Sequence, residues 1–201
     1  MDWKLKNIQK ETEHPYLNFY TVTYEVNKKG KIYNYSYFMA SRHAPGKLVC
    51  ETNDISIPDG VLMPLYYIDP KTKEISLLIT KQFRPPLNKY VHSFPAGLVD
   101  PNESIETTAH REAMEEAGVT IDDLELLCPP SPTSSGLSDE TNAIVIARVT
   151  GFADKNLEAF EDINAKFIPL KDMEEYMNTH FFAMQIRLVI KYLLLKFKGQ
   201  Y

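Results

Sequence analysis

Residues 96–119 read AGLVDPNESIETTAHREAMEEAGV, and the part from residue 104 onward has the periodicity of an amphipathic helix. Ser104 is of a residue type that caps helix N-termini, and Gly118 can adopt the left-handed conformation that often follows a helix. On a helical wheel, the alanines at 109, 113 and 117 fall within about 80° of one another. The sequence therefore predicts a helix over residues 104–117 whose alanine face packs on the rest of the protein.

Two glutamates lie beside this apolar face. Glu112 and Glu116 fall within about 60° of the alanine at 109 on the same wheel. Burying two like-charged carboxylates together is unfavourable unless their pKa values rise or a cation neutralises them. Arg111 can pair with Glu115 four residues on, which leaves Glu112 and Glu116 in need of another partner. A divalent cation meets that need, and oxygen ligands without His or Cys favour Mg²⁺ or Mn²⁺.

The spacing of the fixed residues distinguishes this stretch from an ordinary solvated acidic helix face. It matches the Nudix signature at every fixed position, namely Gly97, Glu103, Arg111, Glu112, Glu115, Glu116 and Gly118, followed by the apolar Val119. The chain therefore resembles a Nudix hydrolase, over roughly residues 35–170. The resemblance is greatest to the ADP-ribose pyrophosphatase branch, and it is carried by FPAGLVD at 94–100, QFRP at 82–85 and SSGLSDE at 134–140.

The resemblance implies an α+β fold, the Nudix α/β/α sandwich, with an N-terminal antiparallel β extension. Residues 18–26 and 31–40 are rich in aromatic and β-branched residues and flank a KKG turn, so their composition predicts a β-hairpin. We expect an N-terminal β-rich region over 1–58, which by resemblance mediates dimerisation, and a Nudix domain over 59–201. Further strands are predicted at 61–68, 75–79, 143–149 and around 166–168, and helices at about 170–178 and 182–197.

Candidate metal ligands follow from the same resemblance. It implies a set of oxygen ligands made of the side chains of Glu112, Glu115 and Glu116 and the backbone carbonyl of Ala96. Glu103 would support this set. Arg111 would take part in the catalytic centre mainly by holding the glutamates in place.

Substrate contacts are implied at three positions. Arg84 and Arg42 would bind the diphosphate and its neighbouring ribose, which the fixed charge and forked donors of arginine suit. Tyr37 would stack on the adenine. Packing in a core or at a dimer interface explains the alternating tyrosines of this strand equally well, so both interpretations of Tyr37 stay open.

The catalytic base is implied to come from the SSGLSDE segment. Glu140 would hold or deprotonate the attacking water, with Asp139 and Glu115 as the alternatives. Ser93 and Ser135 stand where the ADP-ribose branch commonly has an acidic residue and a proline. These departures leave the metal chemistry intact and leave the identity of the leaving group open.

The implied reaction is Mg²⁺-dependent hydrolysis of a nucleoside diphosphate linked to another moiety, with Mn²⁺ able to substitute. ADP-ribose, giving AMP and ribose 5-phosphate, is the first candidate substrate. Other ADP- or UDP-sugars and dinucleotides remain open because the signature does not contact the base. A non-catalytic nucleotide-sensing domain is disfavoured because such domains often lose signature glutamates. An isoprenoid diphosphate isomerase would require a catalytic cysteine near the metal site. Cys50 lies in the N-terminal part and Cys128 lies beyond the signature, so this activity is disfavoured.

Composition excludes several other classes of protein. Apolar residues make up 44% and charged residues 24%, which excludes a wholly disordered chain, and no apolar run approaches the ~18 residues of a membrane span. The net charge of -5 argues against a nucleic-acid partner. Two widely separated cysteines fit a reducing compartment, so we expect a cytoplasmic protein. The Nudix resemblance implies that it is a homodimer and that it binds a small-molecule nucleotide. His92 and His110 are isolated in the sequence and are expected to have structural roles.

Overall fold

The computed structural model describes residues 1–153 and 162–199, and its chain divides into two compact units. The first unit combines Met1–Asp59 with Pro130–Asn142, and the second combines Gly60–Pro129 with Ala143–Tyr201. Residues 130–142 contain the whole SSGLSDE segment at 134–140. Their membership of the N-terminal unit was not expected from a division at residue 58.

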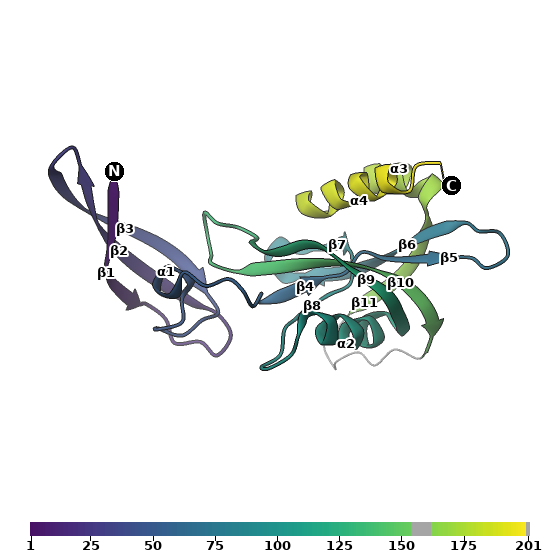
Figure 1. The fold of residues 1–201 in the computed structure, drawn as a ribbon, viewed down its shortest axis with the longest axis horizontal. Coiled ribbons are helices and arrows are strands. Elements are labelled where there is room, and N and C mark those ends of the chain that lie inside the picture. The colour runs from purple at the N-terminus through teal and green to yellow at the C-terminus, as the bar shows by residue number, and fades with distance from the viewer. Residues whose placement is uncertain (154–161, 200–201) are drawn as a thin grey trace. The chain divides into compact units, whose positions relative to one another are not determined.

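The first unit is built on an antiparallel sheet with the strand order β1 (Asp2–Lys10), β2 (Asn18–Lys28) and β3 (Lys31–Ser41) (Figure 1). Lys28 pairs with Lys31, and the two turn residues between them, Lys29 and Gly30, both have positive φ values of 52° and 78°. Two-residue hairpin turns of this kind match the twist of the strands they join. The predicted hairpin is therefore confirmed.

Strand β1 was not predicted, because only three of its nine residues are large and apolar and most of its side chains are exposed. It is added to the hairpin through pairing with β2. Tyr20, Val22 and Met39 form a small core on this sheet with Leu48, which immediately precedes the short helix α1 (Val49–Thr52).

The second unit contains, in the described residues, an eight-stranded sheet with the order β11-β6-β5-β10-β4-β8, to which β7 is added beside β6 and β9 beside β10. Strands β10 and β5 are parallel, while the other registered pairs are antiparallel, so the sheet is mixed. The strands are β4 (Gly60–Leu62), β5 (Leu65–Ile68), β6 (Ile75–Arg84), β7 (Lys89–Ser93), β8 (Ala96–Leu98), β9 (Val119–Pro132), β10 (Thr141–Phe152) and β11 (Ile163–Pro169), with a 3₁₀ turn at Pro85–Leu87.

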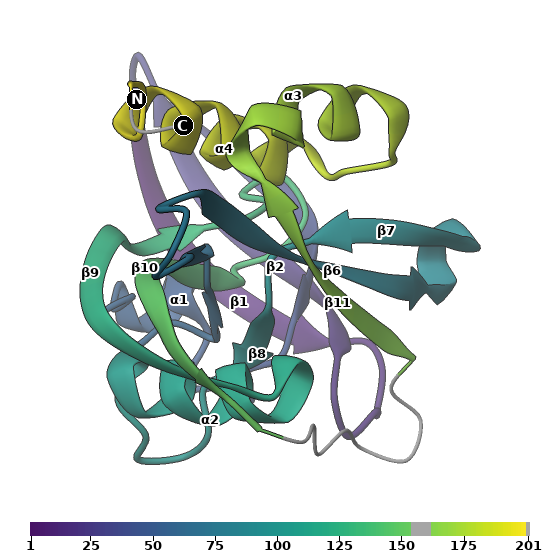
Figure 2. The same ribbon diagram turned by 90° about the vertical axis from the view of Figure 1, so that its right-hand side faces the viewer.

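Helices cover both faces of this sheet (Figure 2). Helix α2 (Ile105–Ala117) lies on one face, and α3 (Leu170–Thr179) and α4 (Met184–Lys196) lie on the other. Strand β6 contributes to both cores because its side chains alternate: Leu77 and Ile79 pack with α3 and α4, whereas Leu78 packs with α2. This arrangement confirms the predicted α/β/α sandwich. No described helix has the length and apolar character needed to span a bilayer.

Candidate active site

Helix α2 begins and ends as the sequence predicts. The Ser104 side chain accepts a hydrogen bond from the backbone N–H of Thr107 at 3.1 Å, and Gly118 takes a left-handed φ of 63° directly after the last turn. Ala109 and Ala113 are fully buried against the sheet. With the alanine face packed on the sheet, Glu112 and Glu116 beside that face lie against strand β8.

Glu116 and Glu112 both contact the backbone of β8. Glu116 is only 7% exposed, and its carboxylate accepts a hydrogen bond from the backbone N–H of Ala96 at 3.0 Å. Glu112 lies against Gly97 so closely that a β-carbon on Gly97 would be 1.8 Å from the carboxyl carbon of Glu112. The glycine of the signature is therefore required by close approach of a carboxylate and not by a turn.

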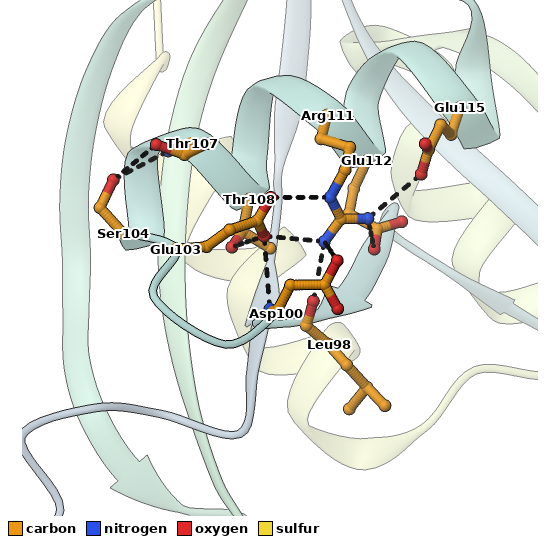
Figure 3. A network of polar contacts seen from close by, with 9 residues as sticks. All are labelled: Leu98, Asp100, Glu103, Ser104, Thr107, Thr108, Arg111, Glu112 and Glu115. Atoms are coloured by element: carbon orange, nitrogen blue, oxygen red, sulfur yellow. Dashed lines mark hydrogen bonds and ion pairs between the residues drawn. The ribbon is translucent and has the colours of Figure 1, made fainter.

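Arg111 connects the acidic residues of this region (Figure 3). Its Nη1 donates to Glu115 at 3.1 Å, which confirms the predicted i,i+4 pair, and to Glu112 at 2.7 Å. Its Nη2 also donates to the backbone carbonyl of Leu98 at 3.0 Å. The expectation that Glu112 and Glu116 lack a protein partner was wrong, because Arg111 reaches Glu112 and β8 supplies an N–H to Glu116.

Glu103 is bound by Arg111 in a two-pronged pair. Nε and Nη2 of Arg111 each donate to a different oxygen of Glu103 at 3.0 Å, and the Thr108 hydroxyl donates to the same carboxylate at 2.8 Å. These bonds, the arginine's first, lower the pKa of Glu103 to about 2, and they raise the pKa of Arg111. Glu103 therefore stays ionised at neutral pH and holds the arginine that orients Glu112 and Glu115.

A pocket of about 340 Å³ opens beside these residues. It is lined by six residues that the sequence analysis named as candidates, Arg84, Ala96, Arg111, Glu112, Glu115 and Glu116, and by Gln82, Gly97, Leu98 and Asp100. Glu103 is not among them. Gln82 was missed as a lining residue, although it lies two positions before Arg84 and so on the same face of β6, which strand alternation alone indicates.

The donors around this pocket fit a divalent cation in their chemistry. Glu112, Glu115 and Glu116 provide only oxygen ligands, on adjacent turns of one helix beside the backbone of β8, as hard cations prefer. Within the described residues, no three Asp, Glu, His or Cys side chains are already arranged around one ion position. Glu112 and Glu115 each accept a hydrogen bond from Arg111 through one carboxylate oxygen.

The remaining candidates belong to the first unit, where they form a group of their own. Arg42 Nε lies 3.2 Å from a carboxylate oxygen of Glu140, and the Thr133 hydroxyl donates to the other oxygen at 3.0 Å. The fold brings Arg42 to Glu140, although the two residues are 98 positions apart in the sequence. The Tyr37 hydroxyl donates to the carbonyl of Gly136 at 2.8 Å and ties β3 to the same loop.

Asp139 lies next to Glu140 and has a contact of its own. One of its oxygens accepts a hydrogen bond from the backbone N–H of Val49, at the first turn of α1, at 3.2 Å. The loop 133–140 is thus joined to β3, to Arg42 and to α1 inside the first unit.

Comparison with known proteins establishes the family. Residues 62–185 match the model of the NUDIX domain, which is more than half of the chain, so this protein belongs to the Nudix family. The chain is 49% identical over 59 residues to the ADP-ribose pyrophosphatase of Saccharomyces cerevisiae, covering 29% of this chain and 25% of that protein. It is 34% identical over 91 residues to the ADP-ribose pyrophosphatase of Bacillus subtilis, covering 45% of this chain and 49% of that one.

One further relative and one solved structure are also similar to this chain. The ADP-sugar pyrophosphatase of Mus musculus is 38% identical over 76 residues, which cover 37% of this chain and 34% of that protein. The matches thus span between a quarter and about half the length of these relatives. A crystal structure of an ADP compounds hydrolase superimposes with a TM-score of 0.69, covering 100% of this chain and 96% of that one. At 17% identity, this likeness shows that the fold is shared.

Proposed function

We propose that this protein is a divalent-metal-dependent hydrolase that cleaves the diphosphate of a nucleoside diphosphate derivative, with ADP-ribose as substrate and AMP and ribose 5-phosphate as products. The observation that carries this proposal is the packing of Glu112 and Glu116 against the backbone of Ala96 and Gly97. A solvated acidic helix face has no need for carboxylates held on a strand in this way. The printed names of the relatives from yeast, mouse and Bacillus subtilis support the substrate class.

The candidate residues around the pocket divide into three proposed roles, namely holding the ion, binding the diphosphate and orienting the glutamates. Mg²⁺ or Mn²⁺, when bound, would supply the positive charge that stabilises a reacting diphosphate and activates water. Glu112, Glu115, Glu116 and the Ala96 carbonyl would hold that ion. Arg84 lines the same pocket with a permanent positive charge, so it would bind the diphosphate, and Arg111 would keep the glutamates oriented.

The first-unit candidates keep their proposed roles. Glu140 would take the proton from the attacking water, Arg42 would bind the substrate's charged group, and Tyr37 would stack on the base. Asp139 and Glu115 are the alternatives for the base. The ion pair between Arg42 and Glu140 supports a link between phosphate binding and proton transfer. If Arg42 turns to the substrate phosphate, it releases the Glu140 carboxylate to accept a proton.

We also propose a cytoplasmic homodimer formed through the β1–β3 sheet. Trp3, Tyr33 and Tyr35 are each close to half exposed on this sheet, and they line a groove of about 750 Å³. Exposed aromatic clusters of this kind are typical of interfaces. Both cysteines, Cys50 and Cys128, are free thiols, which fits a reducing compartment.

A substrate panel tests the activity. Purified full-length protein is incubated with Mg²⁺ and ADP-ribose, ADP-glucose, UDP-glucose or a diadenosine polyphosphate, and nucleoside monophosphate is measured. We expect the highest kcat/KM with ADP-ribose, and Glu116→Gln serves as the inactive control. Release of monophosphate from another member of the panel alone would reassign the substrate. Tight nucleotide binding without any release would show a sensing domain instead of an enzyme.

A further inference from the structure

A second polar pocket of the second unit lies on the face of the sheet that packs against α3 and α4. Its volume is about 430 Å³, which is in the range of small-molecule sites. Lys81 of β6 lines it, whereas Gln82 and Arg84 of the same strand line the candidate active site. Successive strand residues point to opposite faces, so the two pockets lie on opposite sides of β6 and share no lining residue.

Strand register builds the floor of this pocket. Asn164 of β11 lies opposite Lys81 of β6, and Lys81 lies opposite His92 of β7. Residues directly opposite one another on adjacent strands point to the same face. Lys166, two positions beyond Asn164, joins them on that face. The fold thereby gathers two lysines, an amide and an imidazole that are separate in the sequence.

His92 is the buried member of this group. It is 7% exposed, and its Nδ1 has no hydrogen-bond partner among the residues that the structure describes. The centre of its ring lies 4.8 Å from that of His180, although the two residues are far apart in the sequence. Desolvation, with His180 and Lys81 nearby, lowers the pKa of His92 and keeps the ring neutral at neutral pH. A buried polar nitrogen is rarely left without a partner, so His92 Nδ1 is available to a molecule that enters the pocket.

His180 presents a second nitrogen to the pocket's surroundings. Its Nδ1 lies 2.9 Å from the backbone carbonyl of Tyr176, and a carbonyl can only accept, so Nδ1 carries the proton. With the proton on Nδ1, Nε2 can accept a hydrogen bond from a ligand or from water.

The lysines make the pocket locally positive. In the described part of the chain, neither Lys81 nor Lys166 forms an ion pair with a carboxylate, and Lys81 Nζ lies over the ring of Tyr90, 4.5 Å from its centre. The one carboxylate lining the pocket, Asp162, accepts a hydrogen bond from the Tyr90 hydroxyl at 2.6 Å. Two lysines without acidic partners are notable in a chain with a net charge of -5.

We infer that this pocket binds a small phosphate monoester, whose phosphate contacts Lys81 and Lys166 while its hydroxyl groups reach Asp162 and Asn164. The first condition for a ligand is a phosphate, which ammonium groups and an imidazole bind well. The second condition is a set of hydroxyl groups in place of a second anionic group, because the Asp162 carboxylate accepts hydrogen bonds from hydroxyls and repels anions. A sugar phosphate meets both conditions, and inorganic phosphate meets only the first. The inference concerns a site separate from the candidate active site and does not rest on the proposed function.

Binding is measured without substrate turnover. The full chain is titrated with ribose 5-phosphate and with inorganic phosphate by calorimetry, while the ring signals of its histidines are followed by NMR. We expect ribose 5-phosphate to shift the signals of His92 and His180, and Lys81→Met with Lys166→Met to weaken binding at least about tenfold. Lys71→Met, which removes the same charge from an exposed turn, is the matched control and should bind normally.

Further variants separate the possible sites and ligands. Asp162→Asn should reduce the preference for ribose 5-phosphate over inorganic phosphate, whereas equal affinities in the unaltered protein would assign the pocket to inorganic phosphate. Loss of binding in Arg84→Gln but not in the double lysine variant would place the phosphate in the candidate active site and overturn the inference. Absence of binding by the unaltered protein would overturn it too, and would leave His92 with a buried water as its partner. All substituted residues in this test are exposed, and thermal unfolding checks that each variant folds.

Discussion

The carboxyl group of Glu112 lies directly on the backbone of Gly97, where a β-carbon would come within 1.8 Å of it. The contact joins helix α2 to strand β8 at the position where the proposed metal ligands meet. Glu112 can occupy this position only because Gly97 has no β-carbon.

Gly97→Ala should therefore displace Glu112 and lower kcat by at least about tenfold, while the sheet remains folded. The reason is steric, so it can be tested by removing the other partner of the clash. We expect Gly97→Ala to have little further effect in a Glu112→Ala background, since effects of residues in contact are not additive. Equal losses in both backgrounds, measured by steady-state kinetics, would contradict the steric explanation.

Glu116→Gln should lower kcat by several orders of magnitude at saturating Mg²⁺, because a neutral side chain of the same size removes attraction for the ion. The amide can keep the volume of the buried side chain, so circular dichroism should be unchanged. Glu106→Gln, which alters an exposed glutamate on the first turn of the same helix, should have normal activity. Normal kcat in the Glu116 variant would remove this residue from the metal site.

The pair of Glu103 with Arg111 makes stability depend on pH in a defined window. The pKa of Glu103 falls from its ordinary 4.5 to about 2 in the folded protein, so its contribution is fully present above pH 4.5. It is lost as the pH falls through about 2, where the folded protein takes up the proton. Urea unfolding of the unaltered protein and of Glu103→Gln should show a gap in the free energy of unfolding that is constant near neutral pH and narrows below pH 4.5. A gap that widens on acidification would contradict the assigned cause.

Glu140→Gln should reduce kcat strongly and leave the affinity for Mn²⁺, measured by electron paramagnetic resonance, unchanged. This split separates a proton-accepting role from the ion-binding role of the α2 glutamates. Asp139→Asn and Glu115→Gln are compared in parallel. Full kcat in the Glu140 variant with loss in one of the other two would assign the base to that residue.

The proposed dimer predicts a species of twice the 23.1 kDa chain mass in light scattering at micromolar concentration. Trp3→Glu should shift it toward the monomer, because Trp3 lies edge-on against Tyr24 and Tyr35 on the exposed sheet. Tyr16→Glu changes a more exposed aromatic of the same unit outside the strands and should leave the dimer intact. A monomeric unaltered protein would exclude the interface.

Local patterns predicted α2 accurately because its cap, its alanine face and its glycine stop all lie between Ser104 and Gly118. The hairpin was predictable for the same reason. Strand β1 could not be predicted, since its pairing partner and not its own apolar pattern makes it a strand. Likewise, Arg42 and Glu140 are nearly a hundred residues apart in sequence, and nothing local indicates that they pair. Arg111 was assigned one partner from helix spacing, while its bonds to Leu98 and Glu103 depend on the path of the chain before the helix.

Because the side chains of β6 alternate between its two faces, this strand separates the acidic pocket on one face from the aromatic and histidine-lined pocket on the other. An insertion of a single residue ahead of Lys81 would turn that lysine toward the acidic pocket and turn Gln82 and Arg84 toward the aromatic and histidine-lined one. The seven registered pairs between β6 and β11 oppose such a slip. Within β6, evolutionary change is therefore constrained to substitutions, because an insertion or deletion in this strand would alter both pockets at once.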